Sequence, residues 1–135
     1  MRGIALLLIA TTLASCAAAP QPTRSAKAEG HFQKLLAGKV AGPAVSCLPS
    51  YRANDMVVID DQTIAFREGS RRVWVTNLSH SCSNLGSGNY ALVTKRYGGS
   101  GLCRGDIGQV ADLTSGITVG SCVFGDFTPY ETTRG

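Results

Sequence analysis

The feature that most constrains this chain is the placement of its five cysteines, which lie far apart along a sequence of only 135 residues. A zinc site usually takes cysteines in pairs a few residues apart, and a thioredoxin-like thiol needs a Cys-x-x-Cys motif. The chain has neither, because its most closely spaced cysteines, Cys103 and Cys122, are 19 positions apart. The spacing therefore predicts cross-links between distant segments, which requires an oxidising compartment.

The N-terminus indicates such a compartment. It has one positive charge at Arg2, an uncharged apolar run from Gly3 to Leu13, and small residues before Cys16. This arrangement is typical of a secretory signal peptide, and the run is too short to cross ~30 Å of hydrocarbon as a helix. The sequence Leu13-Ala14-Ser15-Cys16 resembles the lipobox of bacterial lipoproteins, which implies cleavage before Cys16 and lipid attachment to it. The alternative is an ordinary signal peptide that leaves Cys16 as a free thiol.

Lipidation at Cys16 predicts a firmly anchored protein of the bacterial envelope, because each buried methylene of an acyl chain contributes ~0.8 kcal/mol. Ala17 stands where a retention signal for the inner membrane typically has Asp, so we expect the outer membrane, with the domain facing the periplasm. The chain then divides into a signal peptide at 1–15, a flexible tether at 16–29, a single β-rich domain at 30–131 and a tail at 132–135.

Removing Cys16 from the count leaves four cysteines, which are expected to form two disulfides. Four cysteines allow three pairings, and the sequence alone does not choose between them. We favour the sequential pairing, in which Cys47 joins Cys82 and Cys103 joins Cys122. Each bond would contribute ~3–4 kcal/mol in the chain-entropy model.

The domain is expected to begin with one short helix and to continue as strands. Residues 31–36 place Phe32, Leu35 and Leu36 on one helical face, and Gly38 marks the end of this helix. Six β-rich segments follow, separated by turns that contain glycine or aspartate. They span residues 56–59, 63–67, 72–78, 90–97, 107–114 and 117–127.

These segments predict a mainly β fold, namely a small curved antiparallel sheet or barrel of about six strands, with a β-sandwich as the alternative. Val73 and Val75 fall on the face opposite Trp74, so that strand is apolar on both sides. A strongly curved sheet with the helix on its outside would bury both faces. Gly120 and Gly125 inside the last strand predict a bulge or bend there.

A series of segments carries a family resemblance, with the order of the cysteines and a Cys-x-Gly-Asp element as its most specific parts. The segments are Gly38 to Cys47, Ile59 to Ile64, Val73-Trp74 with Cys82, Leu102 to Asp106, and Cys122. Over roughly residues 31–130 the chain resembles a group of small proteobacterial exported proteins and lipoproteins that is defined only as a domain of unknown function. The resemblance implies an envelope location and a disulfide-containing β-rich domain, and it implies no catalytic residue.

Side chains suited to chemistry are few, and we predict no catalytic residue, metal site or cofactor. The two histidines, His31 and His80, lack the company of other ligands that a metal site needs. Asp60 and Asp61 are adjacent and are better explained as a turn than as a catalytic pair, with a calcium ligand as the alternative. Asp106 is expected to bind backbone amides before the strand at 107–114.

Basic residues suggest one further surface. Arg67, Arg71 and Arg72 flank one hairpin turn, and Lys95 and Arg96 lie on another strand. If these strands are neighbours, the five side chains form a patch for anionic glycolipid phosphates or an acidic protein. The interpretation that we favour over such a patch is a solvated hairpin and a protected edge strand.

The sequence thus favours a non-enzymatic lipoprotein with a binding or structural role at the outer membrane. Its partners would be the membrane, through Cys16, and an envelope protein or an anionic glycolipid. A formal charge of +4 over 135 residues gives no indication of nucleic-acid binding. One alternative is a periplasmic inhibitor of the lysozyme-inhibitor type, because Ser87-Gly88-Asn89-Tyr90 resembles the Ser-Gly-x-x-Tyr element of such proteins with one residue fewer. A second is a hydrolase with an unrecognised site.

Overall fold

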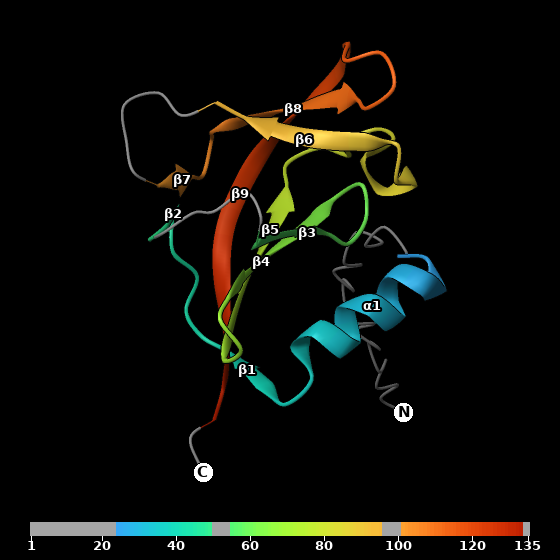
Figure 1. The fold of residues 1–135 in the computed structure, drawn as a ribbon. Helices are drawn as coiled ribbons and strands as arrows, with labels where there is room; N and C mark the ends of the chain where they lie inside the picture. Colours follow the sequence, from blue (N-terminus) through green and yellow to red (C-terminus); the bar gives the residue numbers. More distant parts are fainter. Residues whose placement is uncertain (1–23, 50–54, 96–100, 134–135) are drawn as a thin grey trace, which may run out of the picture.

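The strands form an antiparallel sheet that curls into a half-barrel, and one helix packs against its outer face (Figure 1). The computed structural model describes residues 24–49, 55–95 and 101–133. The helix α1 spans Ala26–Leu36. Six strands follow one another across the sheet in the order β3 (Met56–Val58), β4 (Thr63–Glu68), β5 (Arg72–Leu78), β9 (Thr118–Thr132), β8 (Ile107–Asp112) and β6 (Tyr90–Thr94).

Shorter elements complete the described fold. Strand β1 (Lys39–Ala41) pairs with the end of β9, β2 (Cys47–Leu48) pairs with β7 (Leu102–Cys103), and a 3-10 helix, η2 (Leu85–Ser87), precedes β6. Segments of two or three residues carry no readable periodicity, which is why the sequence did not predict them. The six-strand curved sheet with one N-terminal helix and two disulfides confirms the predicted fold class over the β-sandwich.

The boundaries of the strands agree with the prediction at the start of the sheet and differ at its end. β3, β4 and β5 form the expected three-strand meander. The last strand was expected to end at Phe127 but continues to Thr132, because β5 pairs with this extension on one side and β1 on the other. β6 ends at Thr94, and the last part of the predicted segment 90–97 lies outside the described residues.

The long strand β9 bends where glycines were expected to bend it. Thr76 of β5 lies opposite Phe127, but Leu78 lies opposite Phe124, so β9 contains one extra residue between these two pairs. Gly125 occupies this bulge, and a β-carbon there would come within 2.3 Å of the Asn77 carbonyl oxygen. A second register shift lies next to Gly120, where β9 pairs with β8. Both bulges confirm the prediction, and such bulges increase the local twist of a sheet.

The curled sheet buries apolar side chains on both faces. The inner core is centred on Phe124 and Phe127, which are fully buried. On the outer face, Phe32, Leu35 and Leu36 of α1 pack against a second cluster. That cluster is formed by Ile59, Ala65, Val73 and Val75. The expected helix on the outside of a two-faced sheet is therefore confirmed.

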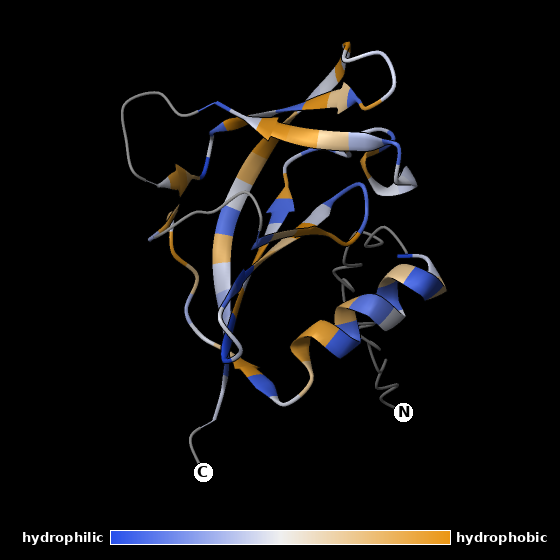
Figure 2. Ribbon diagram, viewed as in Figure 1, coloured by the Kyte–Doolittle hydropathy of each residue, from blue (hydrophilic) through white to orange (hydrophobic). Residues whose placement is uncertain are grey.

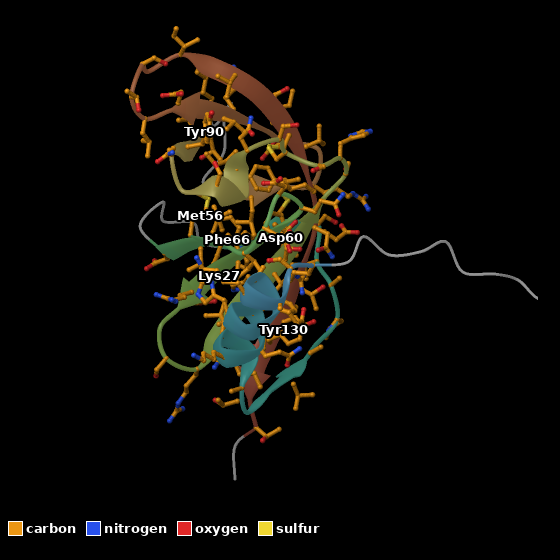
Figure 3. The ribbon with its side chains drawn as sticks, turned by 90° about the vertical axis from the view of Figure 1, so that its right-hand side faces the viewer. Lys27, Met56, Asp60, Phe66, Tyr90 and Tyr130 are labelled. Carbon is orange, nitrogen blue, oxygen red and sulfur yellow. A yellow bond between two sulfur atoms is a disulfide. The ribbon has the colours of Figure 1, made fainter. Side chains whose placement is uncertain are left out.

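The two edge strands of the half-barrel, β3 and β6, do not pair with each other. Met56 on β3 and Tyr90 on β6 are accordingly only partly buried against the inner core. Figure 3 shows both on the same side of the molecule, above the helix that carries Lys27.

The helix begins earlier than predicted, and the boundary between tether and domain moves with it. α1 starts at Ala26 instead of His31, and Ser25 caps it by accepting a hydrogen bond from the Ala28 amide at 3.2 Å. Gly30 lowers helix propensity in this segment, but packing of Ala28 on the outer cluster outweighs it. The predicted tether at 16–29 is therefore too long by its last residues. Residues 16–23 of the tether and the signal peptide lie outside the described residues.

The predicted disulfide pairing is wrong. Cys47 bonds to Cys103, with their α-carbons 4.0 Å apart, and Cys82 bonds to Cys122, with α-carbons 5.5 Å apart. The first pair lies at directly opposed positions of β2 and β7, and the second is buried in the inner core. The sequential pairing fails because loop-closure entropy grows only slowly with length, so the sheet topology decides which cysteines meet.

Peptide mapping tests this pairing directly, since each of the four cysteines falls in a different tryptic peptide. Non-reducing digestion followed by mass spectrometry should link peptide 40–52 to 97–104 and peptide 73–95 to 105–134. Reduction before digestion is the control and should release all four peptides. A link between 40–52 and 73–95 would contradict the structure.

Substituting Gly125→Ala should destabilise the domain by about 1–3 kcal/mol, because the new methyl group would collide with the Asn77 carbonyl in the bulge. Gly120→Ala is the matched control in the same strand, since a β-carbon at Gly120 meets nothing within 4 Å. Its effect should stay within about 0.5 kcal/mol. Urea unfolding of the oxidised protein gives both values, and equal stabilities for the two variants would refute the role of the bulge.

Candidate functional site

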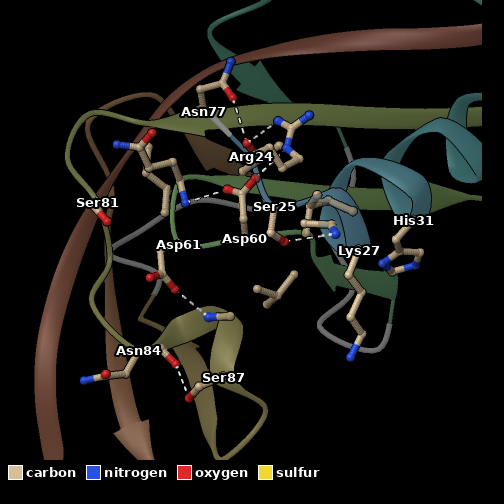
Figure 4. A pocket seen from close by; sticks show the side chains of 17 residues that line it. Arg24, Ser25, Lys27, His31, Asp60, Asp61, Asn77, Ser81, Asn84 and Ser87 are labelled. Atoms are coloured by element: carbon tan, nitrogen blue, oxygen red, sulfur yellow. Dashed lines mark hydrogen bonds and ion pairs between the residues drawn. The ribbon is translucent and has the colours of Figure 1, made fainter. Parts of the chain in front are cut away.

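An open cleft of about 990 Å³ lies where the start of α1, the turn between β3 and β4, and the segment around η2 meet (Figure 4). We call it the Asp60 cleft. Its walls are formed by Arg24, Lys27 and His31 on one side and by Ser81, Asn84 and Ser87 on the other, with Asp60, Asp61 and Gln62 between them.

Arg24 joins the helix to the sheet at one end of the cleft. Its Nε donates to Asp60 Oδ2 at 2.5 Å and its Nη2 donates to Thr63 Oγ1 at 2.9 Å. Its Nη1 donates to Glu29 Oε2 in the first turn of α1, also at 2.9 Å. The guanidinium lies 4.2 Å from the centre of the Phe32 ring, a cation–π distance. One side chain therefore binds the turn between β3 and β4 and the first turns of α1 together.

The Asp60 carboxylate is held in its charged form. Partial burial alone would raise its pKa, but the hydrogen bonds from Arg24 and from the Gln62 amide lower the pKa below its ordinary value. The Gln62 amide donates to Asp60 Oδ1 at 2.8 Å, so the carboxylate also closes the turn on itself. Both oxygens of Asp60 thus have structural partners.

Asp61 turns to the other side of the cleft and holds η2. Its Oδ1 accepts a hydrogen bond from the Gly86 amide at 2.7 Å, and its carbonyl accepts one from the Cys82 amide at 2.6 Å. Two adjacent carboxylates therefore fix two different elements, α1 and η2. This confirms that the pair forms a turn and that the two side chains point apart.

The rest of the lining combines uncharged polar side chains with apolar ones, among them Val58, Ile59 and Leu78. Ser81, Asn84 and Ser87 are exposed along one wall. His31 and Lys27 extend from α1 on the far side from Asp61, as Figure 4 shows, and no hydrogen bond within the described site joins His31 to a serine or a carboxylate. Within the ranges that the structure describes, no three His, Cys, Asp or Glu side chains converge to hold a metal ion.

The predicted basic patch is not assembled. Arg72 is paired with Glu68 at 3.1 Å and with Glu131 at 2.5 Å, and Arg67 and Arg71 are exposed beside it. Lys95 follows β6, which β9 and β8 separate from the β4–β5 hairpin, so the neighbouring strands that the patch required are absent from the sheet order. Arg96 and the predicted lipidation residue Cys16 lie outside the described residues.

The structure also shows where the other residues singled out in the sequence lie. Asp106 accepts a hydrogen bond from the Cys103 amide at 2.7 Å, as predicted, and closes the turn before β8. His80 is exposed in the loop after β5. The inhibitor-like element is divided, because Ser87 lines the Asp60 cleft while Tyr90 packs against the inner core.

Sequence reasoning missed the most connected residue of the site, Arg24. Ser25 followed by Glu29 is a recognisable helix start, with a capping residue before an acidic first turn. This signal would have extended the helix to Ala26 and brought Arg24 to its beginning. Its bonds to Asp60 and Thr63, 36 and 39 positions away, have no local signature.

The fold and the site define a disulfide-linked β half-barrel domain with an open cleft at the start of its helix. A family model described as "Family of unknown function (DUF6491)" matches residues 1–123, and the chain belongs to this family. The resemblance to a domain of unknown function, seen in the sequence, is thereby confirmed. No curated protein and no solved structure matches the chain. In the described part of the chain, no helix is both long and apolar enough to cross a membrane.

Arg24→Ala should lower the free energy of unfolding by about 1–2 kcal/mol at pH 7, because it removes the charged partner of Asp60. The folded-state pKa of Asp60 lies below its unfolded value of about 3.9, so its contribution is present above that pH and is lost as the pH falls through the folded pKa. Glu29, whose pKa is lowered by hydrogen bonds from Gln33 and Arg24, acts in the same direction. The difference between wild type and variant should therefore shrink at pH 3.

Urea unfolding at both pH values measures this effect. Lys34→Ala, an exposed change in the last turn of α1, is the control and should alter stability at neither pH. An Arg24→Ala effect of equal size at pH 7 and pH 3 would show that Arg24 stabilises the domain through packing on Phe32 instead of through the carboxylates.

Proposed function

We propose that this protein is a lipid-anchored component of the bacterial envelope, held at the outer membrane and facing the periplasm, and that its β domain binds an envelope protein through the Asp60 cleft. The apolar run before Cys16 and the lipobox-like Leu13-Ala14-Ser15-Cys16 support the anchor. The spaced cysteines, joined in two disulfides, support an oxidising compartment.

The binding role rests on one observation, namely the hydrogen bonds that the carboxylates of the cleft accept from other parts of the domain. A general acid or base must have a free position facing the substrate, whereas Asp60 is hydrogen-bonded at both oxygens and Asp61 is held through Oδ1 by a backbone amide, which leaves only its Oδ2 free within the described part of the chain. The groups left to meet a ligand are amides and hydroxyls, such as those of Asn84 and Ser87, together with the single cation of Lys27, the His31 imidazole and an apolar part of the lining. Such groups match the polar backbone and side chains of a polypeptide better than the phosphates of a glycolipid, which need a cluster of unpaired cations.

The place of the cleft relative to the predicted anchor supports the same role. Arg24 is both a wall of the cleft and the first residue of the described domain. Eight residue steps separate it from Cys16, so a fully extended chain spans at most about 29 Å between them. A lipid at Cys16 therefore keeps the cleft near the membrane surface, where it meets membrane-associated partners.

Site-specific photo-cross-linking in cells tests both parts of this proposal. A photo-reactive residue at Asn84, in the cleft wall, should form an adduct with an envelope protein, whereas the same residue at Ser70, exposed in the β4–β5 turn, should not. Cys16→Ser should remove radiolabelled palmitate from the protein, release it from the membrane fraction and reduce the adduct. Ala17→Asp is the matched control: it should keep the label but move the protein to the inner membrane.

Three results would overturn the proposal. Palmitate labelling that survives Cys16→Ser would exclude the anchor. Equal adducts from Asn84 and Ser70, or an absence of adducts from the cleft, would exclude the cleft as the binding site.

A further inference from the structure

The outer face of the curled sheet is covered on one half only. α1 covers the face formed by β3, β4 and β5, but no described element packs on the outward side chains of β6 and β8 and of the first half of β9. Leu92 and Val110 point into the inner core, so their neighbours along each strand point outward. The outward side chains Val93, Ile107 and Val119 are 43%, 56% and 49% exposed.

This face ends at a hairpin tip that is both apolar and almost free of charge. Leu113 and Ile117, on either side of the turn between β8 and β9, are 65% and 64% exposed, the two highest values among the large apolar side chains described. From Ile107 to Val123 the only charged residue is Asp112. Figure 2 shows apolar colouring along β6 and β8, and Figure 1 shows that this hairpin projects at the end of the molecule opposite β1.

The backbone amides of the tip all have acceptors within the protein. The Thr114 and Ser115 amides donate to Asp112 Oδ1 at 2.7 and 3.0 Å, and the Gly116 amide donates to the Asp112 carbonyl at 2.8 Å. The Ile117 amide has an acceptor in the Ser115 hydroxyl at 3.4 Å. The two strands are tied just before the turn, because the Asp112 amide donates to the Ile117 carbonyl and the Leu113 amide donates to Asn89.

A turn with this pattern suits a medium of low dielectric constant. In contact with lipid, every unpaired backbone amide is penalised, whereas a turn in water can leave its amides to the solvent. In this tip each amide from Asp112 to Ile117 has an internal acceptor, and the single carboxylate faces amides instead of solvent alone. Hydrogen bonds from the Ser115 and Thr114 amides lower the pKa of Asp112, in keeping with this engagement.

We propose that the β8–β9 tip, residues 112–117, is a membrane-contacting surface that places Leu113 and Ile117 in the headgroup boundary of a lipid bilayer. The occupant is the bilayer to which the protein is anchored, so this inference rests on the proposed lipid anchor at Cys16. Two apolar side chains alone hold a protein only weakly on a membrane, but a tether keeps the tip at high local concentration beside it.

The lengths of the tether and of β9 are compatible with this contact. Two strand pairings connect the position of Arg24 to β9. Arg24 contacts Thr63 of β4, which lies opposite Asn77 of β5, and the neighbouring Thr76 lies opposite Phe127 of β9. Phe127 is nine residues from Thr118 at the tip, about 30 Å along a strand and less in a straight line because β9 bends. The predicted tether reaches about 29 Å from Arg24. A nearly fully extended tether would therefore bring the anchor and the tip to one bilayer.

Tryptophan quenching by brominated lipids tests the contact on the full lipidated chain. The protein is purified from membranes and reconstituted into vesicles of phosphatidylethanolamine and phosphatidylglycerol that contain brominated phosphatidylcholine. Trp74, the native tryptophan, is 6% exposed and serves as the internal background. Leu113→Trp should be quenched by bromine near the headgroup boundary, whereas Val40→Trp, an exposed position on β1 at the opposite end, should be quenched no more than the background.

A second measurement separates the possible outcomes. Adding Ile117→Asp to the Leu113→Trp protein should reduce the bromine quenching about tenfold, because it places an unpaired charge in the boundary. Equal quenching of the tryptophans at positions 113 and 40 would overturn the proposal. So would protection of the tryptophan at 113 that depends on protein concentration and not on bromine, because a second copy would then cover this face. Intact mass of the purified protein reports lipidation separately, so a failed anchor is not confused with a failed tip.

Discussion

The pairing of β9 with two different partners is the constraint on which the rest of the structure depends. Its first part pairs with β8 and its second part with β5, and the extra residue at Gly125 lies near the point where the partners change. A straight strand of this length would produce a flat sheet with two exposed faces, whereas the bulge bends it and allows Phe124 and Phe127 to enter one inner core. The buried disulfide between Cys82 and Cys122 secures the same bend, because it ties the loop after β5 to β9 just before the bulge.

The curvature also determines where the Asp60 cleft can form. Bending separates the edge strand β3 from β6 and leaves the turn after β3 at the rim of the sheet, where α1 and η2 approach it from two sides. The Asp60 and Asp61 side chains point in opposite directions at this rim. Asp60 accepts a hydrogen bond from Arg24, and Asp61 accepts one from the Gly86 amide. The site is therefore a junction of three elements whose polar groups are mostly used to hold the junction together. Its exposed amides and hydroxyls, with Lys27 and His31 on the helix side, are what remains for a ligand.

The sequence predicted those features whose signals are local. Four such features follow from the properties of neighbouring residues. They are the β3–β5 meander, the apolar helix face with Phe32, the bulges at Gly120 and Gly125, and the turn at Asp60. It failed where distant segments meet. The strand order places β9 and β8 between β5 and β6. Three features depend on this order: the cysteine pairing, the bonds of Arg24, and the separation of Lys95 from the β4–β5 hairpin. Local periodicity says which residues form strands but carries little about which strands become neighbours.

The two surfaces proposed for this protein differ in chemistry because α1 covers only one half of the outer face of the half-barrel. On the half that α1 covers, burial of the apolar cluster leaves polar groups at the rim, and these form the cleft. On the other half, an equivalent apolar face is left open and continues into a tip whose amides are already paired. Exposing such an apolar face to water is unfavourable, and only one charged residue lies between Ile107 and Val123. A partner surface that covers the face best explains why it is apolar. A bilayer at the β8–β9 tip would cover the end of this face, Leu113 and Ile117, and leave the Asp60 cleft, at the level of Phe127 on β9, open to the periplasm.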